Sequence, residues 1–223
     1  MSTFAQRTLT CSACRQPSAM SVAVSLNGGR QPDLRLAILD GTFQRITCPS
    51  CGVPGRIEQP FVYLDFTRKH WITCFNHRRE ASWATLEGEP HEDWKEAMIT
   101  FAPPMVREMS ASFRIRAVFG VDALREKLLC FEHGIDDVWL AVLQLDAMRS
   151  VAGLGFSPAR RLRLSHVDPD ALHFRVMGDG AEWSVPRARL IEMQTAALEW
   201  SAAHEILGRG PYVDVGRLMF GRR

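Results

Sequence analysis

Two short stretches, Cys11-Ser12-Ala13-Cys14 and Cys48-Pro49-Ser50-Cys51, decide the fold of the first half of this chain. In each stretch two residues separate two thiols, so one tight turn can direct both sulfurs at a single metal ion about 2.3 Å away. Two such turns supply all four corners of a tetrahedron and leave no open position for water or substrate. The spacing therefore predicts one structural zinc ion held by the four cysteines.

Residues around the two cysteine pairs fit this prediction. Gly52 follows the second pair directly, where a positive φ helps the chain turn back, and Pro49 stiffens the same turn. Four thiolates around Zn²⁺ leave a local charge of about −2. The arginines nearest in sequence, expected to offset that charge, are Arg7, Arg15, Arg45 and Arg56.

Paired cysteines can also form disulfides or a redox-active site. Disulfides would need an oxidising compartment, yet residues 1–7 show no hydrophobic signal core, so a cytoplasmic location is expected. A redox-active pair opens a helix, and no helical pattern follows either stretch. A thiol-based redox switch remains the second alternative, after a nucleic-acid-binding zinc ribbon.

Two further cysteines lie outside the pairs. Cys74 and His77 have ligand spacing, but Cys74 ends a strand-like segment and is interpreted as a core residue because four thiolates already complete the site. Cys130 lies on a predicted helix and is interpreted as a packing residue. Whether the Cys74/His77 pair substitutes as ligands stays open at this point.

Composition indicates a folded protein with a hydrophobic core. The chain has 223 residues, of which 46% are hydrophobic and 23% charged, and its formal net charge is +2. Its apolar runs are shorter than the ~20 residues of a membrane span, so no membrane association is expected. Of the 27 basic residues 24 are arginine, which suits phosphate recognition, but the sequence shows no basic stripe. A protein partner is therefore favoured over nucleic acid.

Residues 8–110 are predicted to form a zinc-ribbon-like domain. Strands are expected on either side of the second cysteine pair, with a short helix from Pro32 to Gly41 inserted in the long loop. A helix is also expected over 92–101, before Pro103. The predicted strands of this domain are 20–26, 43–47, 56–58, 61–65, 70–74 and a short 83–86.

The rest of the chain is predicted to form two further units, which makes the fold α+β. Residues 111–152 are expected to hold a strand (113–119) and a helical hairpin whose helices begin at the caps Asp122 and Asp136. Residues 153–223 are expected to form a β-β-β-α-β unit. Its elements are strands 161–167, 171–177 and 181–185, one long helix 187–207, and a closing strand 212–219.

The order of several motifs resembles that of the bacterial CpXC-domain proteins. The second cysteine pair reads Cys-Pro-x-Cys-Gly, as is typical of that family, whereas Ser12 stands where the family's first pair usually has proline. The further motifs that carry the resemblance are Ser25-Leu26-Asn27, Pro32-Asp33-Leu34, Ile38-Leu39-Asp40-Gly41, Tyr63-Leu64-Asp65, Val118-Phe119-Gly120, Leu124-Arg125-Glu126-Lys127 and Gly134-Ile135-Asp136-Asp137. The resemblance covers roughly residues 8–150 and implies a zinc-binding, ribbon-like domain in a cytoplasmic bacterial protein. It implies no activity.

No catalytic motif accompanies the cysteines. The seven histidines show no H-E-x-x-H or comparable spacing with one another, and there is no G-x-S-x-G, phosphate-binding loop or dinucleotide-binding glycine pattern. The sequence thus favours a non-enzymatic protein in which a structural zinc site supports an interaction surface for another macromolecule. An activity in the C-terminal unit stays open.

Overall fold

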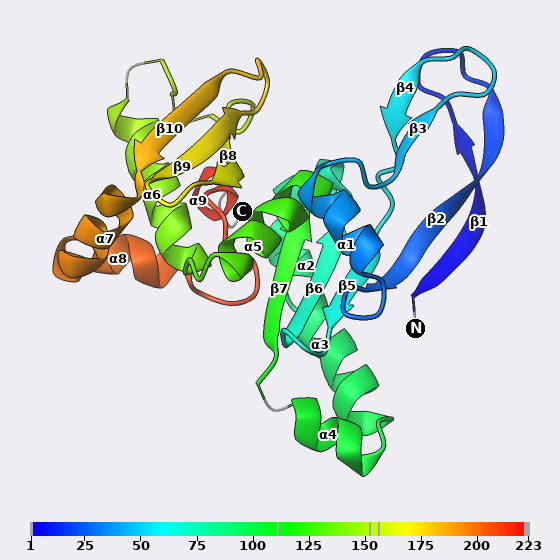
Figure 1. Ribbon diagram of the computed structural model, residues 1–223, viewed down its shortest axis with the longest axis horizontal. Coiled ribbons are helices and arrows are strands. Elements are labelled where there is room, and N and C mark those ends of the chain that lie inside the picture. Colours follow the sequence, from blue (N-terminus) through cyan, green and yellow to red (C-terminus); the bar gives the residue numbers. More distant parts are fainter. Residues whose placement is uncertain (1, 111, 152, 156, 221–223) are drawn as a thin grey trace.

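The computed structural model describes residues 2–110, 112–151, 153–155 and 157–220. Its largest feature is a five-stranded mixed sheet in the order β1-β2-β5-β6-β7 (Figure 1). The pairs β1–β2 and β5–β6 are antiparallel, whereas β2–β5 and β6–β7 are parallel. The strands of this sheet are β1 (Thr3–Thr10), β2 (Pro17–Asn27), β5 (Phe61–Asp65), β6 (His70–Phe75) and β7 (Arg114–Phe119).

The β1–β2 hairpin projects well beyond this sheet (Figure 1). Only Ser25–Asn27 of β2 pair with β5, although β2 has 11 residues and pairs with β1 from Pro17 to Ser25. The interior strand β6 is buried throughout, as expected for a strand with neighbours on both sides and helices on both faces. Strand β1 is not predictable from its sequence, because its mostly exposed residues show no apolar alternation.

Helices cover both faces of the sheet. On one face α1 (Pro32–Leu39) and α5 (Val121–Glu132) pack over a core that includes Ile72 and Cys74. On the other face, the alternate residue Phe75 packs with Trp83 and Leu86 of α2 (Trp83–Leu86). The period of two along β6 thus separates two cores.

Two predictions for this region were wrong. Residues 83–86, predicted as a strand, form α2, whose buried Trp83 and Leu86 are three apart and share a helical face. Asp122, predicted as the cap of α5, lies in its first turn instead, and Gly120 with φ of 89° precedes the helix. Asp136 is confirmed as a cap, because its side chain accepts from the amides of Val138 and Trp139.

A helical arm, formed by α3 (Glu89–Lys95) and α4 (Pro104–Ser110), extends away from the sheet beyond the ends of β6 and β7 (Figure 1). The predicted helix over 92–101 is observed as α3, continued as a π-helical turn over Glu96–Thr100. A further helix, α4, begins at the proline pair and was not predicted. Met98 of the π-helical turn packs on Trp71 and Ile115 of the sheet, which fixes the base of the arm.

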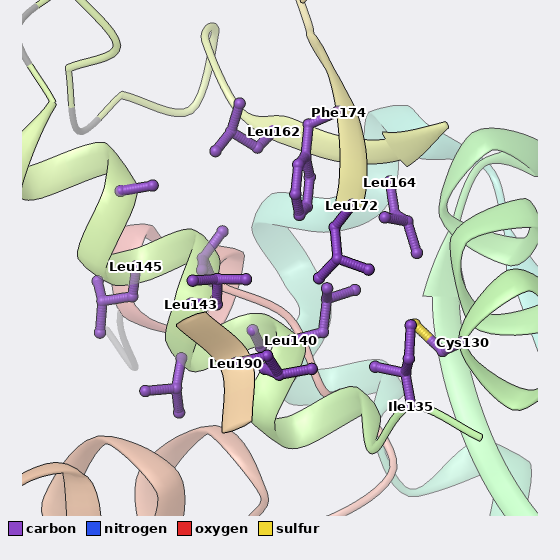
Figure 2. Close-up of a cluster of buried hydrophobic side chains, with 14 of the residues drawn as sticks. Cys130, Ile135, Leu140, Leu143, Leu145, Leu162, Leu164, Leu172, Phe174 and Leu190 are labelled. Carbon is purple, nitrogen blue, oxygen red and sulfur yellow. The ribbon is translucent and has the colours of Figure 1, made fainter. Parts of the chain in front are cut away.

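The C-terminal part encloses a second large core. A three-stranded antiparallel sheet, β10-β9-β8, packs against α6 (Asp137–Ser150), and Figure 2 shows leucines of both elements around the side chain of Phe174. These three strands confirm the prediction for this part of the chain. Their bounds are β8 (Leu162–Val167), β9 (Ala171–Val176) and β10 (Glu182–Pro186).

After β10 the chain differs from the predicted β-β-β-α-β unit. The long helix is two helices, α7 (Arg187–Thr195) and α8 (Ala197–Leu207), and the hydroxyl of Thr195 donates to the carbonyl of Ile191 at the break. Residues 212–219 are not a strand but a buried loop followed by α9 (Gly216–Met219).

The physical reason for the missing closing strand lies in its backbone partners. The carbonyl of Val213 accepts from the Lys127 ammonium, and the carbonyl of Tyr212 accepts from the Arg217 guanidinium. These carbonyls therefore accept hydrogen bonds from side chains and are not available to the backbone amides of a neighbouring strand. The fold is α+β as predicted, while the division of the chain at residues 110 and 152 stays a prediction. No helix among the described residues is long and apolar enough to cross a bilayer.

Candidate metal centre

The two cysteine pairs occupy the turns of two hairpins whose tips meet. The first pair lies in the turn between β1 and β2, and the second lies between β3 (Arg45–Thr47) and β4 (Pro54–Arg56). Both tips are at the same end of the molecule, beyond the edge of the main sheet (Figure 1). Segments separated by the whole of α1 are thereby brought together.

The two turns have the same backbone hydrogen bonds. The amide of Arg15 donates to the carbonyl of Cys11 at 3.0 Å, and the amide of Gly52 donates to the carbonyl of Cys48 at 2.9 Å. In each turn the leading cysteine also donates to the residue five positions further on. The two matching residues have positive φ, 62° for Arg15 and 71° for Gly52. The predicted role of Gly52 is confirmed, and Arg15 adopts the same conformation without being glycine.

The four sulfurs of Cys11, Cys14, Cys48 and Cys51, here named the four-cysteine site, all lie within 4.8 Å of one another. Across the two turns, Sγ of Cys11 is 3.9 Å from Sγ of Cys51, and Sγ of Cys14 is 3.8 Å from Sγ of Cys48. A tetrahedral zinc ion with Zn–S distances of about 2.3 Å places its sulfurs about 3.8 Å apart. The donor set fits a metal ion of this size, and the thiols are free rather than disulfide-bonded.

Backbone amides favour the thiolate form within these turns. In the second turn, the amides of Cys51 and Ser50 lower the pKa of Cys48 to about 6. In the first turn, the amide of Cys14 has the main part in lowering the pKa of Cys11. At Cys51 a backbone amide acts in the same direction, but the other three sulfurs raise the pKa to about 12. Because a metal binds the thiolate and not the thiol, the turn geometry prepares the sulfurs of Cys11 and Cys48 for ligation.

Two of the arginines expected near the thiolates are directed elsewhere. Arg45 donates through Nε to the carbonyl of Gly41 at 2.6 Å, and Arg56 donates to the same carbonyl at 2.9 Å. Arg56 also pairs with Asp122 at 2.7 Å. These guanidinium groups therefore serve the end of α1 and not the four-cysteine site.

Cys74 and His77 do not join the site. Cys74 is buried in the core beneath α1 and α5, where burial raises the pKa of its thiol, and His77 faces Glu58 with Nδ1 3.4 Å from Oε2. In the part of the chain that the structure describes, the four-cysteine site is the one group of three or more His, Cys, Asp or Glu residues arranged to hold a metal ion.

The variant Cys74→Ser is expected to keep its zinc content unchanged. It should lose about 1–3 kcal/mol of stability, because a hydroxyl replaces a thiol in an apolar core. Elemental analysis and urea denaturation of the purified variant check both expectations. Loss of metal from Cys74→Ser would instead make Cys74 a ligand.

Strand register also brings together two histidines that were not predicted to form a site. His166 of β8 and His173 of β9 are cross-strand partners, and each directs Nε2 to a different oxygen of Asp168 at 2.7 Å. Six residues lie between the two histidines, so no turn spacing signals the pair. Only the pairing of β8 with β9 across a register shift reveals it.

Comparisons with known proteins agree with the cysteine geometry. The family model described as CpXC protein matches residues 9–144, more than half of the chain. The match includes both cysteine turns and α1, and it ends within α6. Neither a search of curated proteins nor a search of solved structures found a match. On the strength of the family match, the chain belongs to the CpXC protein family.

Proposed function

We propose that the four-cysteine site holds one structural zinc ion and forms a zinc-ribbon-like unit from the two hairpins. The observation that carries this proposal is the approach of four sulfurs to within 4.8 Å of one another. A bound zinc ion would supply a fixed cross-link between the two turns. Because the protein provides all four ligands, the proposed role of the metal is structural and not catalytic.

The hairpins need such a cross-link on physical grounds. The strands β3 and β4 have three residues each and pair only with one another among the described residues. Isolated two-stranded hairpins are marginally stable in water. A structural zinc ion contributes about 10–16 kcal/mol of apparent binding free energy, which exceeds what so small a hairpin gains by burial.

The proposed biological role of this unit is to present an interaction surface, with another protein as the favoured partner. Strand β1 is the terminal strand of the five-stranded sheet and keeps most of its eight residues exposed. A terminal strand offers backbone N–H and C=O groups to a further strand, which is a common way for proteins to recognise extended peptides. The formal net charge of +2 gives little general attraction to a polyanion.

Removal of the metal is expected to release both hairpins while leaving the C-terminal sheet intact. Hydrogen exchange followed by mass spectrometry would compare zinc-replete and chelator-treated protein. Amides of β1, β3 and β4 should lose protection, because their order depends on the cross-link, whereas amides of β8 and β9 should not change. Unchanged exchange in the hairpins after complete zinc removal would contradict a structural role.

A further inference from the structure

Three arginines from different elements converge on the C-terminal end of α1. Arg45 of β3 and Arg56 of β4 donate to the carbonyl of Gly41, and Arg125 of α5 donates through Nε to the carbonyl of Leu39 at 2.6 Å. These three side chains around Gly41 are named the arginine cradle. The cradle links the second cysteine hairpin to the helices α1 and α5 over the main sheet.

The three guanidinium groups of the arginine cradle surround the face of Gly41 that carries no side chain. Gly41 has φ of +78°, and a Cβ placed on it would lie 3.9 Å from Nη1 of Arg125 and 4.0 Å from Nη2 of both Arg45 and Arg56. No other atom outside the adjoining residues lies closer to that point. An open cavity of about 620 Å³ adjoins the cradle, and Arg45 and Arg56 belong to its lining.

Helix capping explains only part of this arrangement. The carbonyls of Leu39 and Gly41 attract cations, as the end of a helix does. Yet Nη2 of Arg45 and Nη1 of Arg125, both beside the bare face of Gly41, have no acceptor among the described residues. Capping of one helix end uses fewer donors than the three guanidinium groups provide.

The surrounding charge is positive. Arg125 interacts electrostatically with Arg56 and Arg175, and also with Asp122 and Asp40. Asp122 pairs with Arg56, and Asp40 is held by the amide and hydroxyl of Thr42. Four arginines thus face two aspartates, and counting Glu58 in the wall of the adjoining cavity still leaves one positive charge in excess.

We propose that the arginine cradle is a binding site for a single phosphoryl group, of the phosphate or phosphate-monoester class. Guanidinium groups match the geometry of phosphate oxygens and stay charged at every physiological pH. Donors that converge on one point suit one phosphoryl group, whereas a polymer backbone requires a row of cations. This site goes beyond the proposed zinc role, and it stands on arginines that are not metal ligands.

Calorimetric titration of the full chain with inorganic phosphate tests the site directly. The zinc content is measured first. A protein that lacks zinc is then distinguished from one that holds zinc but does not bind phosphate. We expect saturable binding that is about tenfold weaker in Arg45→Ala, which removes one charge-assisted hydrogen bond. Arg45 is exposed, so this variant should fold, and the exposed Arg30→Ala serves as the matched control with unchanged binding.

A second variant and two further ligands complete the test. Gly41→Ala places a methyl group among the three guanidinium groups and should abolish phosphate binding; circular dichroism would check its fold, since the positive φ strains alanine. O-phosphoserine that binds more tightly than phosphate identifies a monoester, and equal binding identifies free phosphate. Both results support the site. Absence of saturable binding, equal affinity in Arg45→Ala, or binding of a single-stranded oligonucleotide but not of phosphate would overturn it.

Discussion

The variant Cys48→Ser is expected to lose stoichiometric zinc and to unfold both cysteine hairpins. Cys48 is the most buried of the four ligands, and its sulfur lies 3.8 Å from that of Cys14 in the opposite turn. Loss of one thiolate breaks the closed tetrahedron, and the energy at stake, about 10–16 kcal/mol, is as large as the whole stability of a typical domain.

Elemental analysis and hydrogen exchange would measure this effect, with Cys74→Ser as the matched control. Both variants replace a buried cysteine by serine, but only Cys48 belongs to the four-cysteine site. Zinc should therefore disappear from one variant and remain in the other. A Cys48→Ser protein that is fully folded and carries one zinc ion would rule out the four-cysteine assignment.

The second large effect is expected for Arg163→Leu, in the buried charge network beneath the C-terminal segment. The guanidinium of Arg163 lies 2.5 Å from Asp214 and 3.2 Å from Glu126, and all three side chains are buried. Removal of one partner leaves buried carboxylates without their counter-charge. The variant should lose about 3–5 kcal/mol of unfolding free energy, measured by urea denaturation.

Arg160→Leu is the matched control for this variant. Arg160 pairs with Asp179 at 2.6 Å, but both side chains are nearly half exposed, so its loss should cost at most about 1 kcal/mol. Equal destabilisation by the two variants would show that the buried network contributes no more than a surface ion pair.

The same network has an expected dependence on pH. Burial alone would raise the pKa of Asp214, but Arg163 and Arg161 more than offset burial and lower it from 3.8 to about 2. The contribution of the ion pair is therefore fully present above pH 4 and is lost as pH falls toward 2. The stability difference between wild type and Arg163→Leu should narrow over that range.

The cysteine turns could be predicted from sequence because their chemistry is local. Two thiols separated by two residues define a turn wherever it occurs, and a second such pair completes a tetrahedron. The strands β5 and β6 and the strands of the C-terminal sheet were predictable for a similar reason, since apolar alternation shows within a few residues. Helix α1 carries its own signals, Pro32 at the start and Gly41 at the end.

Features that depend on distant partners could not be predicted in this way. The apolar residues of 212–219 have the pattern of a strand. Their backbone, however, is hydrogen-bonded by side chains, as when the Lys127 ammonium donates to the carbonyl of Val213. The arginine cradle joins Arg125 to the carbonyl of Leu39, 86 residues earlier in the chain. Composition showed an excess of arginine, but only the fold shows which of the arginines converge.

Zinc stoichiometry tests the central claim most directly. The measurement combines elemental analysis of purified protein with a thiol titration under denaturing conditions in the presence of chelator. The account predicts one zinc ion per chain and six titratable thiols, since the chain has six cysteines and all are free. Protein without metal and with fewer than six thiols would contradict the zinc site and favour the redox switch.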